Sequence, residues 1–222
     1  MRTVIFDLDG TLADTSGDLI AAANACFRAM GADDQLDPLK DAGTALRGGR
    51  AMLKLGFSRL GHGGDAEIDA QYPVLLDAYE AAIDRHTVLY PGAMAAVEAL
   101  ASAGFRVGIC TNKPERLADL LLRRLGIRSA FGSLVGGDTL RVRKPDPAPY
   151  RLSVEQAGGA VARSMLIGDT ETDRNTGLSA GVPVALVTFG PDSSDVTALR
   201  PEALLHDFAE LPELAARFLP AG

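Results

Sequence analysis

Short apolar runs alternate with longer segments of helical periodicity along most of this chain. Runs with the length and the turn-bounded flanks of buried strands occupy residues 3–6, 106–110, 133–135, 164–167 and 184–187. Between most of these runs, apolar residues recur at intervals of three and four, as Leu117, Leu120, Leu121 and Leu125 do within residues 114–125. This alternation predicts an α/β fold with a Rossmann-like parallel sheet that is covered by helices on both faces.

The alternation is interrupted once, because about a hundred residues separate the first predicted strand from the second. Segments of helical periodicity in this interval occupy residues 16–30, 46–60 and 66–86. Pro73 is expected to kink or interrupt the last of these helices. We therefore expect a helical insertion at residues 16–86, with residues 1–15 and 87–222 forming the core that carries the sheet.

The composition limits the possible partners. The chain is 47% hydrophobic and has a formal net charge of -7, which argues against nucleic acid and against an anionic membrane surface. No run approaches the roughly 18 apolar residues of a membrane span. The two cysteines, Cys26 and Cys110, lie far apart in apolar segments, which favours reduced thiols and a cytoplasmic location. Small anionic substrates remain compatible with this charge if a local cation or a metal binds them.

Polar residues gather where the predicted strands end. Four such stretches are DLDGT at 7–11, TNK at 111–113, RKPDP at 143–147 and GDTETD at 168–173. In an open parallel sheet, ligands bind beyond the carboxyl ends of the strands, near the point where the strand order reverses. All four stretches could therefore line one cleft.

The acidic residues of these stretches indicate a metal site. Within an extended segment Asp7 and Asp9 project to the same side, and Asp169 would bring a third carboxylate close to them. Carboxylates at such short range raise one another's pKa unless a cation lies between them. A small set of oxygen ligands suits Mg²⁺, which often binds phosphate as well.

Three further residues at the strand ends could bind an anion. Lys144 offers a positive charge, and Thr111 and Asn112 offer a hydroxyl and an amide that could orient phosphoryl oxygens. A carboxylate attacks phosphorus efficiently only where the charge of the phosphoryl group is neutralised, which is a task for Mg²⁺ and a lysine. These residue types at the strand ends could therefore hold a phosphoryl group beside the metal.

These motifs resemble the four signature motifs of the haloacid dehalogenase-like hydrolases, and the match is closest to the phosphoglycolate phosphatase-like branch. The resemblance rests on DLDGTLADT near the N-terminus, the TN of 111–112, the KP of 144–145 and GDTETD at 168–173. It extends over the whole chain, since LYPGAMAAVEALASAGFRVGICTNKP at 89–114 is typical of that branch and the insertion falls where the family has its cap domain. It implies a Mg²⁺-dependent phosphatase of small phosphorylated metabolites, with phosphoglycolate as the leading substrate candidate.

The resemblance also implies roles for the acidic residues. Asp7 would be the nucleophile that attacks phosphorus and becomes an aspartyl phosphate. Asp9 would protonate the leaving oxygen and then activate the water that hydrolyses the intermediate. Asp7, Asp169 and the backbone carbonyl of Asp9 would be the protein's ligands to Mg²⁺.

Further residues have supporting roles under this resemblance. Thr111 and Lys144 would hold the phosphoryl oxygens, and Asp173 would position Lys144 or a water molecule of the metal. Arg47 and Arg50 in the insertion could reach an anionic substrate, as cap residues do in similar enzymes. The other basic residues near the motifs are expected to be solvated charges: Lys113, Arg141 and Arg143.

Alternatives remain for the residues and for the function. Thr111 and Asn112 could simply cap the following helix, and Asp173 could simply favour a helix start. A receiver domain, a phosphorylated switch, also uses strand-end carboxylates and Mg²⁺ but is much shorter and lacks the insertion. A phosphomutase would use the same core residues and pass the phosphoryl group to a second hydroxyl. A haloalkanoic acid dehalogenase needs neither Mg²⁺ nor an acid at position 9, so the presence of Asp9 argues against that reaction.

The sequence does not indicate which oligomeric state the protein adopts.

Overall fold

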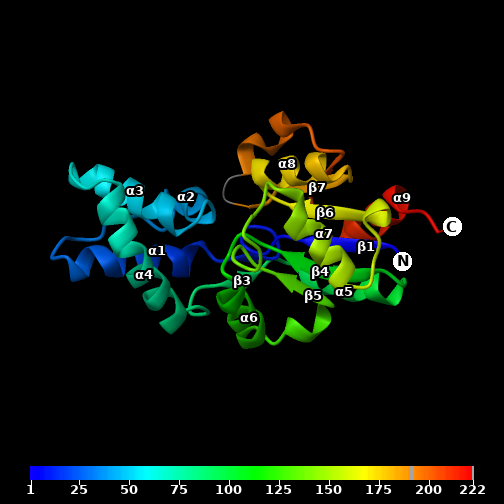
Figure 1. The fold of residues 1–222 in the computed structure, drawn as a ribbon, viewed down its shortest axis with the longest axis horizontal. Coiled ribbons are helices and arrows are strands. Elements are labelled where there is room, and N and C mark those ends of the chain that lie inside the picture. The colour runs from blue at the N-terminus through cyan, green and yellow to red at the C-terminus, as the bar shows by residue number, and fades with distance from the viewer. Residues whose placement is uncertain (191–192, 222) are drawn as a thin grey trace. The chain divides into compact units, whose positions relative to one another are not determined.

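The computed structural model describes residues 1–190 and 193–221, and the chain divides into two compact units. One unit comprises Met1–Ala13 with Leu89–Gly222 and carries the main sheet, and the other comprises Asp14–Val88 and is helical (Figure 1). The insertion expected at 16–86 lies within this second unit. Residues 191–192 and 222 of the expected core lie outside the described residues.

Six parallel strands form the main sheet, in the order β5-β4-β1-β6-β7-β8. They are β1 (Thr3–Phe6), β4 (Arg106–Cys110), β5 (Ser133–Val135), β6 (Ser164–Gly168), β7 (Val184–Val187) and β8 (Ala203–Leu205). Five of the six occupy predicted strand positions, and the α/β prediction is confirmed. The edge strand β8 is not among the predicted strands, because it has three residues and two of them are only half-buried.

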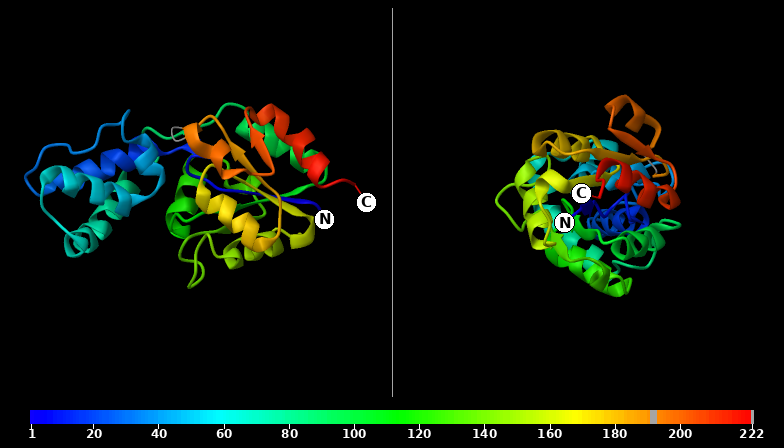
Figure 2. Two further views of the ribbon diagram at one scale, coloured as in Figure 1. Left: turned by 90° about the horizontal axis from the view of Figure 1, so that it is seen from above. Right: turned by 90° about the vertical axis from the view of Figure 1, so that its right-hand side faces the viewer.

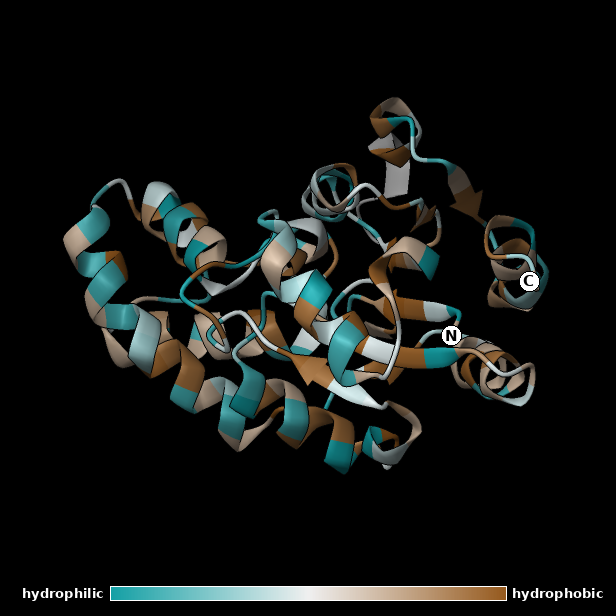
Figure 3. Ribbon diagram, turned by 45° about the vertical axis from the view of Figure 1, so that its right-hand side comes forward, coloured by the Kyte–Doolittle hydropathy of each residue, from teal (hydrophilic) through white to brown (hydrophobic). Residues whose placement is uncertain are grey.

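The central strands are buried on both faces, which explains why their sequences are continuously apolar. All four residues of β1 are buried, and the strands appear hydrophobic in Figure 3. Phe6 of β1 pairs in register with Ile109 of β4 and with Ile167 of β6, so the three strands end level with one another. The chain runs outward from β1 to β4 and β5 and then returns to β6 on the other side of β1, which makes this edge the point where strand order reverses.

Helices cover both faces of this sheet. They are α5 (Ala93–Ser102), α6 (Glu115–Arg124), α7 (Pro147–Gln156), α8 (Glu171–Ala180) and α9 (Leu211–Phe218), with short 3₁₀ turns at Arg128–Ala130, Val161–Arg163, Ser193–Leu199 and Phe208–Glu210. Helices α7 and α8 pack side by side on one face, and α5 and α9 pack together on the other (Figure 2). The predicted helix at 114–125 is α6, with Leu117 and Leu121 buried.

The helical unit contains α1 (Ser16–Ala29), α2 (Ala42–Leu46), α3 (Gly49–Leu60) and α4 (Asp65–Ala81). Just before α1, the carboxylate of Asp14 accepts hydrogen bonds from the amide of Ser16 at 3.0 Å and from its hydroxyl at 2.6 Å, which fixes the start of the helix. Of the two effects expected of Pro73, an interruption of the last helix is wrong, because α4 continues through it, and a kink stays a prediction. Buried residues on both sides, Ile68 before and Leu75 after, hold the helix against its neighbours despite the missing N–H.

The chain passes twice between the two units, at residues 13–14 and at residues 88–89. Strand β2 (Ala13–Asp14) pairs with β3 (Val88–Leu89), and the amide of Tyr90 donates to the carbonyl of Leu12 at 3.0 Å. Inside the helical unit, the buried carboxylate of Asp18 accepts hydrogen bonds from the amides of His86 and Thr87 and from the hydroxyl of Thr87. The first and last segments of this unit are therefore joined by one side chain.

Across the described part of the chain, the structure contains no helix with the length and apolar character that a membrane span requires.

Candidate active site

Hydrogen bonding between adjacent strands continues past the last strand residues and fixes two of the predicted site residues. The amide of Asp7 donates to the carbonyl of Ile167 at 2.8 Å, and the amide of Thr111 donates to the carbonyl of Val135 at 3.0 Å. Asp7 and Thr111 are therefore held at the carboxyl edge of the sheet by the same pairing that forms the strands.

A tight turn follows Asp7 and brings a hydroxyl back toward the sheet. Gly10 has a φ of 82°, a left-handed conformation that favours glycine, and its amide donates to the carbonyl of Ala13 at 2.9 Å. This turn directs the hydroxyl of Thr11 to Oδ1 of Asp169, at 2.8 Å. Thr11 is fully buried, so its hydroxyl has few alternatives to this bond. Thr11 thus fixes the carboxylate of Asp169.

Asp173 is held where β6 passes into α8. Its Oδ2 accepts hydrogen bonds from the amide of Asp169 at 3.3 Å, the amide of Thr170 at 3.2 Å and the hydroxyl of Thr170 at 2.7 Å. The carboxylate lies against the backbone of Gly168, where a Cβ atom would come within 2.3 Å of Cγ of Asp173. A glycine at 168 is therefore required for this position of Asp173.

Lys144 lies between two of the carboxylates. Its Nζ is 3.0 Å from Oδ2 of Asp7 and 2.6 Å from Oδ1 of Asp173, and its side chain is only 1% exposed. Burial lowers the pKa of Lys144, but the charges of Asp173 and Asp7 together outweigh this effect and raise it. Lys144 is therefore a permanent cation in contact with both carboxylates.

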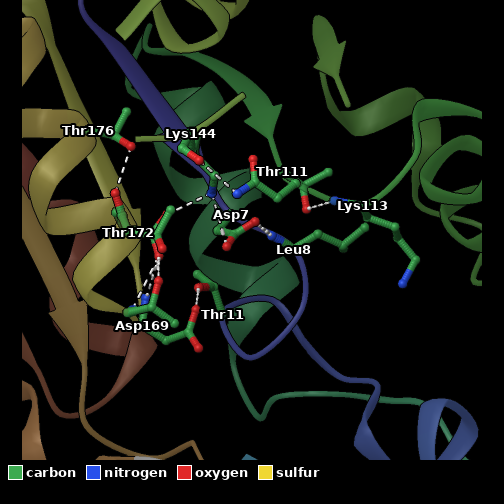
Figure 4. A network of polar contacts seen from close by, with 12 residues as sticks. Asp7, Leu8, Thr11, Thr111, Lys113, Lys144, Asp169, Thr172 and Thr176 are labelled. Carbon is green, nitrogen blue, oxygen red and sulfur yellow. Dashed lines mark hydrogen bonds and ion pairs between the residues drawn. The ribbon is translucent and has the colours of Figure 1, made fainter. Parts of the chain in front are cut away.

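Asp7, Asp169 and Asp173 form a cluster in which one carboxylate oxygen of each residue lies within 4.8 Å of those of the other two. Asp7 and Asp169 of this cluster are labelled in Figure 4. Burial raises the pKa of Asp7 to about 6, with Lys144 opposing the rise and Asp173 adding to it. Burial also raises the pKa of Asp169, and the charges of Asp173 and Asp7 add to this. Ionising the cluster is therefore unfavourable without a cation, and a set of oxygen ligands alone fits a hard divalent cation.

This cluster contains Asp173 in addition to the two side chains that the sequence suggests as ligands. The expected contribution of Asp9 is its backbone carbonyl, and its carboxylate is not part of the cluster. The expected role of Asp173 is to position Lys144, and the two side chains are in direct contact. The assignment of individual ligands stays a prediction.

The neighbouring strand end contributes two more of the predicted residues. Thr111 is 2% exposed, and its Oγ1 accepts a hydrogen bond from the amide of Lys113 at 3.2 Å. Asn112 is exposed, and its side-chain amide donates to the backbone carbonyl of Lys144 at 3.0 Å. Asn112 therefore ties the loop that carries Lys144 to the end of β4.

The arginines proposed for the insertion are exposed residues of the helical unit. Arg47 directly follows α2, and its contact with a substrate stays a prediction. Arg50 pairs with Asp69 at 2.5 Å and lies over the ring of Tyr72, at 5.1 Å from its centroid. Arg50 therefore contacts two residues of α4, within its own unit.

The expectation that Lys113 is a solvated charge is wrong. Lys113 is 7% exposed, and its Nζ donates to Oδ1 of Asp9 at 2.8 Å. The sequence holds only part of the signal: Lys113 lies in the TNK stretch at a strand end, but its partner Asp9 lies at another strand end and could not be assigned from that stretch. Arg141 and Arg143 are exposed, as expected.

Known proteins resemble this chain in sequence and in fold. Residues 1–181 match the family model of the haloacid dehalogenase-like hydrolases. The chain is 37% identical over 229 residues to a phosphoglycolate phosphatase of Rhodospirillum rubrum, covering 100% of this chain and 93% of that protein.

Solved structures show the same fold at lower identity. A predicted phosphoglycolate phosphatase from Haemophilus somnus has a TM-score of 0.82 at 22% identity, covering 96% of this chain and 97% of that one. A protein provisionally assigned as a beta-phosphoglucomutase, from Thermotoga maritima, has a TM-score of 0.75 at 22% identity, covering 99% of this chain and 100% of that one. Since proteins assigned to different reactions share this fold, the fold alone does not choose between those reactions.

Proposed function

This chain belongs to the haloacid dehalogenase-like hydrolases, and we propose that it is a Mg²⁺-dependent phosphatase of small phosphomonoesters. Its class as a phosphoric monoester hydrolase follows from relatives that match over the full chain. The metal, the intermediate and the substrate are the proposal. The observation that carries it is the close cluster of Asp7, Asp169 and Asp173, with the ammonium group of Lys144 paired to Asp7 and to Asp173.

The charges at the site support a divalent cation. Six charged side chains meet there: Asp7, Asp9, Asp169, Asp173, Lys113 and Lys144. When all are ionised, four carboxylates face two ammonium groups, and a divalent cation would balance the remaining two negative charges. The carboxylates of Asp7 and Asp169 would hold the cation, with Asp173 beside them. When bound, Mg²⁺ would neutralise charge on the phosphoryl group.

In the first step, a carboxylate oxygen of Asp7 attacks phosphorus. The bond from phosphorus to the leaving oxygen breaks, Asp9 gives that oxygen a proton, and an aspartyl phosphate forms on Asp7. Lys144 contacts Asp7, so its charge lies where the phosphoryl oxygens would carry negative charge. The hydroxyl of Thr111 would orient one of these oxygens.

In the second step, Asp9 takes a proton from a water molecule whose oxygen attacks phosphorus. The bond between phosphorus and Asp7 breaks, which releases inorganic phosphate and restores the free carboxylate. The two steps require one carboxylate to act first as an acid and then as a base. Asp9 is two residues from the nucleophile, and its charge adds to the rise in the pKa of Asp7, which supports a position close to the reacting atoms.

We propose phosphoglycolate as the preferred substrate, because the relatives with full-length similarity are named as phosphatases of this compound. Glycolate is small and anionic, and a cation from the helical unit, with Arg47 as the candidate, would favour it over a neutral leaving group. A phosphomutase is the competing proposal, since it would use the same core residues. A receiver-like switch would retain the phosphoryl group on Asp7 without turnover.

The proposal is tested by measuring phosphate release from a panel of phosphorylated metabolites with Mg²⁺ and after chelation. We expect Asp7→Asn to lower turnover on the order of 10³-fold or more while circular dichroism shows an unchanged fold. Glu171→Gln, which changes an exposed acid on α8, is the matched control and should retain activity. Turnover by Asp7→Asn near the unsubstituted rate would contradict the assignment of the nucleophile. Formation of an isomer in place of inorganic phosphate would favour the mutase.

A further inference from the structure

A second buried lysine lies at the site, and the steps described above give it no part. The side chain of Lys113 is 4% exposed, and its Nζ lies 2.8 Å from Oδ1 of Asp9, whose side chain is 16% exposed. Lys144 contacts Asp7, whereas Lys113 contacts Asp9. The proposed nucleophile and the proposed acid and base are therefore each in contact with a different lysine.

The backbone of Lys113 is fixed on both sides. Its amide donates to Oγ1 of Thr111 at 3.2 Å, and its carbonyl accepts a hydrogen bond from the amide of Gly137 at 2.8 Å. Pro114 follows and leads directly into α6. Because a rigid strand end holds this backbone, the ammonium group has a narrow range of positions, and so does the carboxylate that it binds.

Stability alone is a poor explanation for a buried ion pair at this position. Removing an ammonium group and a carboxylate from water carries a desolvation cost that offsets much of their attraction, and apolar residues of similar volume often serve stability as well. A lysine at this position is better explained by its effect on the orientation of the Asp9 carboxylate. A carboxylate that must reach both a leaving oxygen and a water molecule depends on such positioning.

We propose that Lys113 is a positioning residue that holds the carboxylate of Asp9 in the orientation that proton transfer requires. This inference rests on the function proposed for Asp9. Lys113 acts through Asp9, so its loss lowers the rate of the chemical steps and leaves the binding of substrate almost unchanged. A displacement of the carboxylate by about 1 Å lowers the rate on the order of 100-fold.

The test is a double-mutant cycle between Lys113→Met and Asp9→Asn, measured on an alkyl phosphate and on p-nitrophenyl phosphate with saturating Mg²⁺. We expect Lys113→Met to lower kcat for the alkyl phosphate by about 10- to 100-fold and to change KM by less than about twofold. In the Asp9→Asn background, Lys113→Met should change the remaining rate by less than about twofold. Formation of p-nitrophenol in the first turnover should fall less than that of the alkyl product, because nitrophenolate leaves without a proton.

Two further variants keep the result interpretable. Arg141→Met removes an exposed positive charge three residues before Lys144 and should change neither kcat nor KM. Lys113→Gln retains a hydrogen-bond donor and serves if Lys113→Met shows no cooperative thermal transition. We expect Lys113→Gln to retain more activity than Lys113→Met.

Three outcomes would overturn the inference. A rise in KM with kcat retained would mean that Lys113 binds substrate directly. An equal loss of rate with and without Asp9 would mean that the two residues act independently, and full activity in both Lys113 variants would mean that the ion pair has no part in the reaction. Failure of the proposed function is distinguishable, because then the unsubstituted protein would release no phosphate or Asp9→Asn would retain its rate.

Discussion

At the scale of single residues, the acidic cluster depends on hydrogen bonds from groups that are not themselves ligands. Thr11 is the clearest case, since its fully buried hydroxyl donates to Asp169 at 2.8 Å. Thr11→Val keeps the shape of the side chain and removes this donor. We expect the affinity for Mg²⁺ to fall about 10- to 100-fold, because a carboxylate that has lost its supporting hydrogen bond is less well oriented. The measurement is the dependence of activity on Mg²⁺ concentration.

Two control variants separate this effect from a general loss of stability. Thr11→Ser retains the hydroxyl and should keep most of the affinity. Thr176→Val removes another buried hydroxyl, but that one donates to the carbonyl of Thr172 within α8 at 2.7 Å (Figure 4). An equal loss of Mg²⁺ affinity in Thr176→Val would show that Thr11 has no specific part in metal binding.

Much of the candidate site could be placed from the sequence, because strand ends in a parallel sheet converge whatever lies between them. Asp7, Asp169 and Lys144 lie together although the chain between the two aspartates includes the entire helical unit. The contact of Lys113 with Asp9 could not be assigned, because it depends on which side chains of the neighbouring strand end are within reach. One strand read alone does not contain that information.

At the scale of secondary structure elements, Asp18 joins the first helix of the helical unit to its last segment. It is 3% exposed and accepts hydrogen bonds from the amide of Thr87 and the hydroxyl of Thr87, both at 2.8 Å. Asp18→Ala leaves these buried donors without their acceptor, and we expect it to destabilise the unit by about 2 kcal/mol. Urea denaturation would measure the loss, and faster hydrogen exchange in α1 would locate it.

Asp77→Ala is the control for this prediction, because Asp77 is an exposed acid on α4 of the same unit. Its effect should stay within about 0.5 kcal/mol. Equal stability of Asp18→Ala and the unsubstituted protein would mean that water replaces the carboxylate without cost, and that the two ends of the unit are held together by packing alone.

Helix periodicity predicts where the elements of this unit lie better than where they end. The expected helix at 46–60 begins at Gly49, after a separate short helix, α2, that ends at Leu46. The expected helix at 66–86 ends at Ala81, and Pro73 does not divide it. The first difference arises at Gly48, whose φ of 96° is not helical and separates α2 from α3. The continuation of α4 through Pro73 arises from packing, which holds a helix together across an unfavourable residue and which the sequence of one segment does not encode.

At the scale of the whole molecule, the cluster couples the sheet unit to its proposed metal. Its residues come from the ends of β1 and β6 and from the start of α8, so they are brought together only when this unit is folded. A ligand that binds only the folded state stabilises it, by about 2.7 kcal/mol at one hundred times its dissociation constant. We therefore expect Mg²⁺ to raise the melting temperature by roughly 5 to 10 °C.

Ca²⁺, which is larger and less strict in geometry, should support activity poorly.

The pH dependence of this shift follows from the raised pKa values. In the metal-free protein, burial raises the pKa of Asp7 from the ordinary 3.8 to about 6, so the neutral carboxyl is favoured by folding. The stability that this contributes is complete below pH 3.8 and is lost as the pH rises through about 6. Metal binding needs the ionised form, so the increase in melting temperature caused by Mg²⁺ should grow over the same interval.

Asp169→Asn separates the stability that is lost through repulsion between the buried carboxylates from the stability that is gained when Mg²⁺ binds. It removes one buried negative charge and keeps the size of the side chain. Without metal, near pH 8, this variant should be at least as stable as the unsubstituted protein, since the repulsion that raises the pKa of Asp169 is relieved. With Mg²⁺ it should gain little, since the metal has lost a ligand. Differential scanning fluorimetry measures the four melting temperatures, those of both proteins with and without Mg²⁺. A variant that is less stable without metal and still gains stability from Mg²⁺ would show that Asp169 has a structural part and that the cation binds elsewhere.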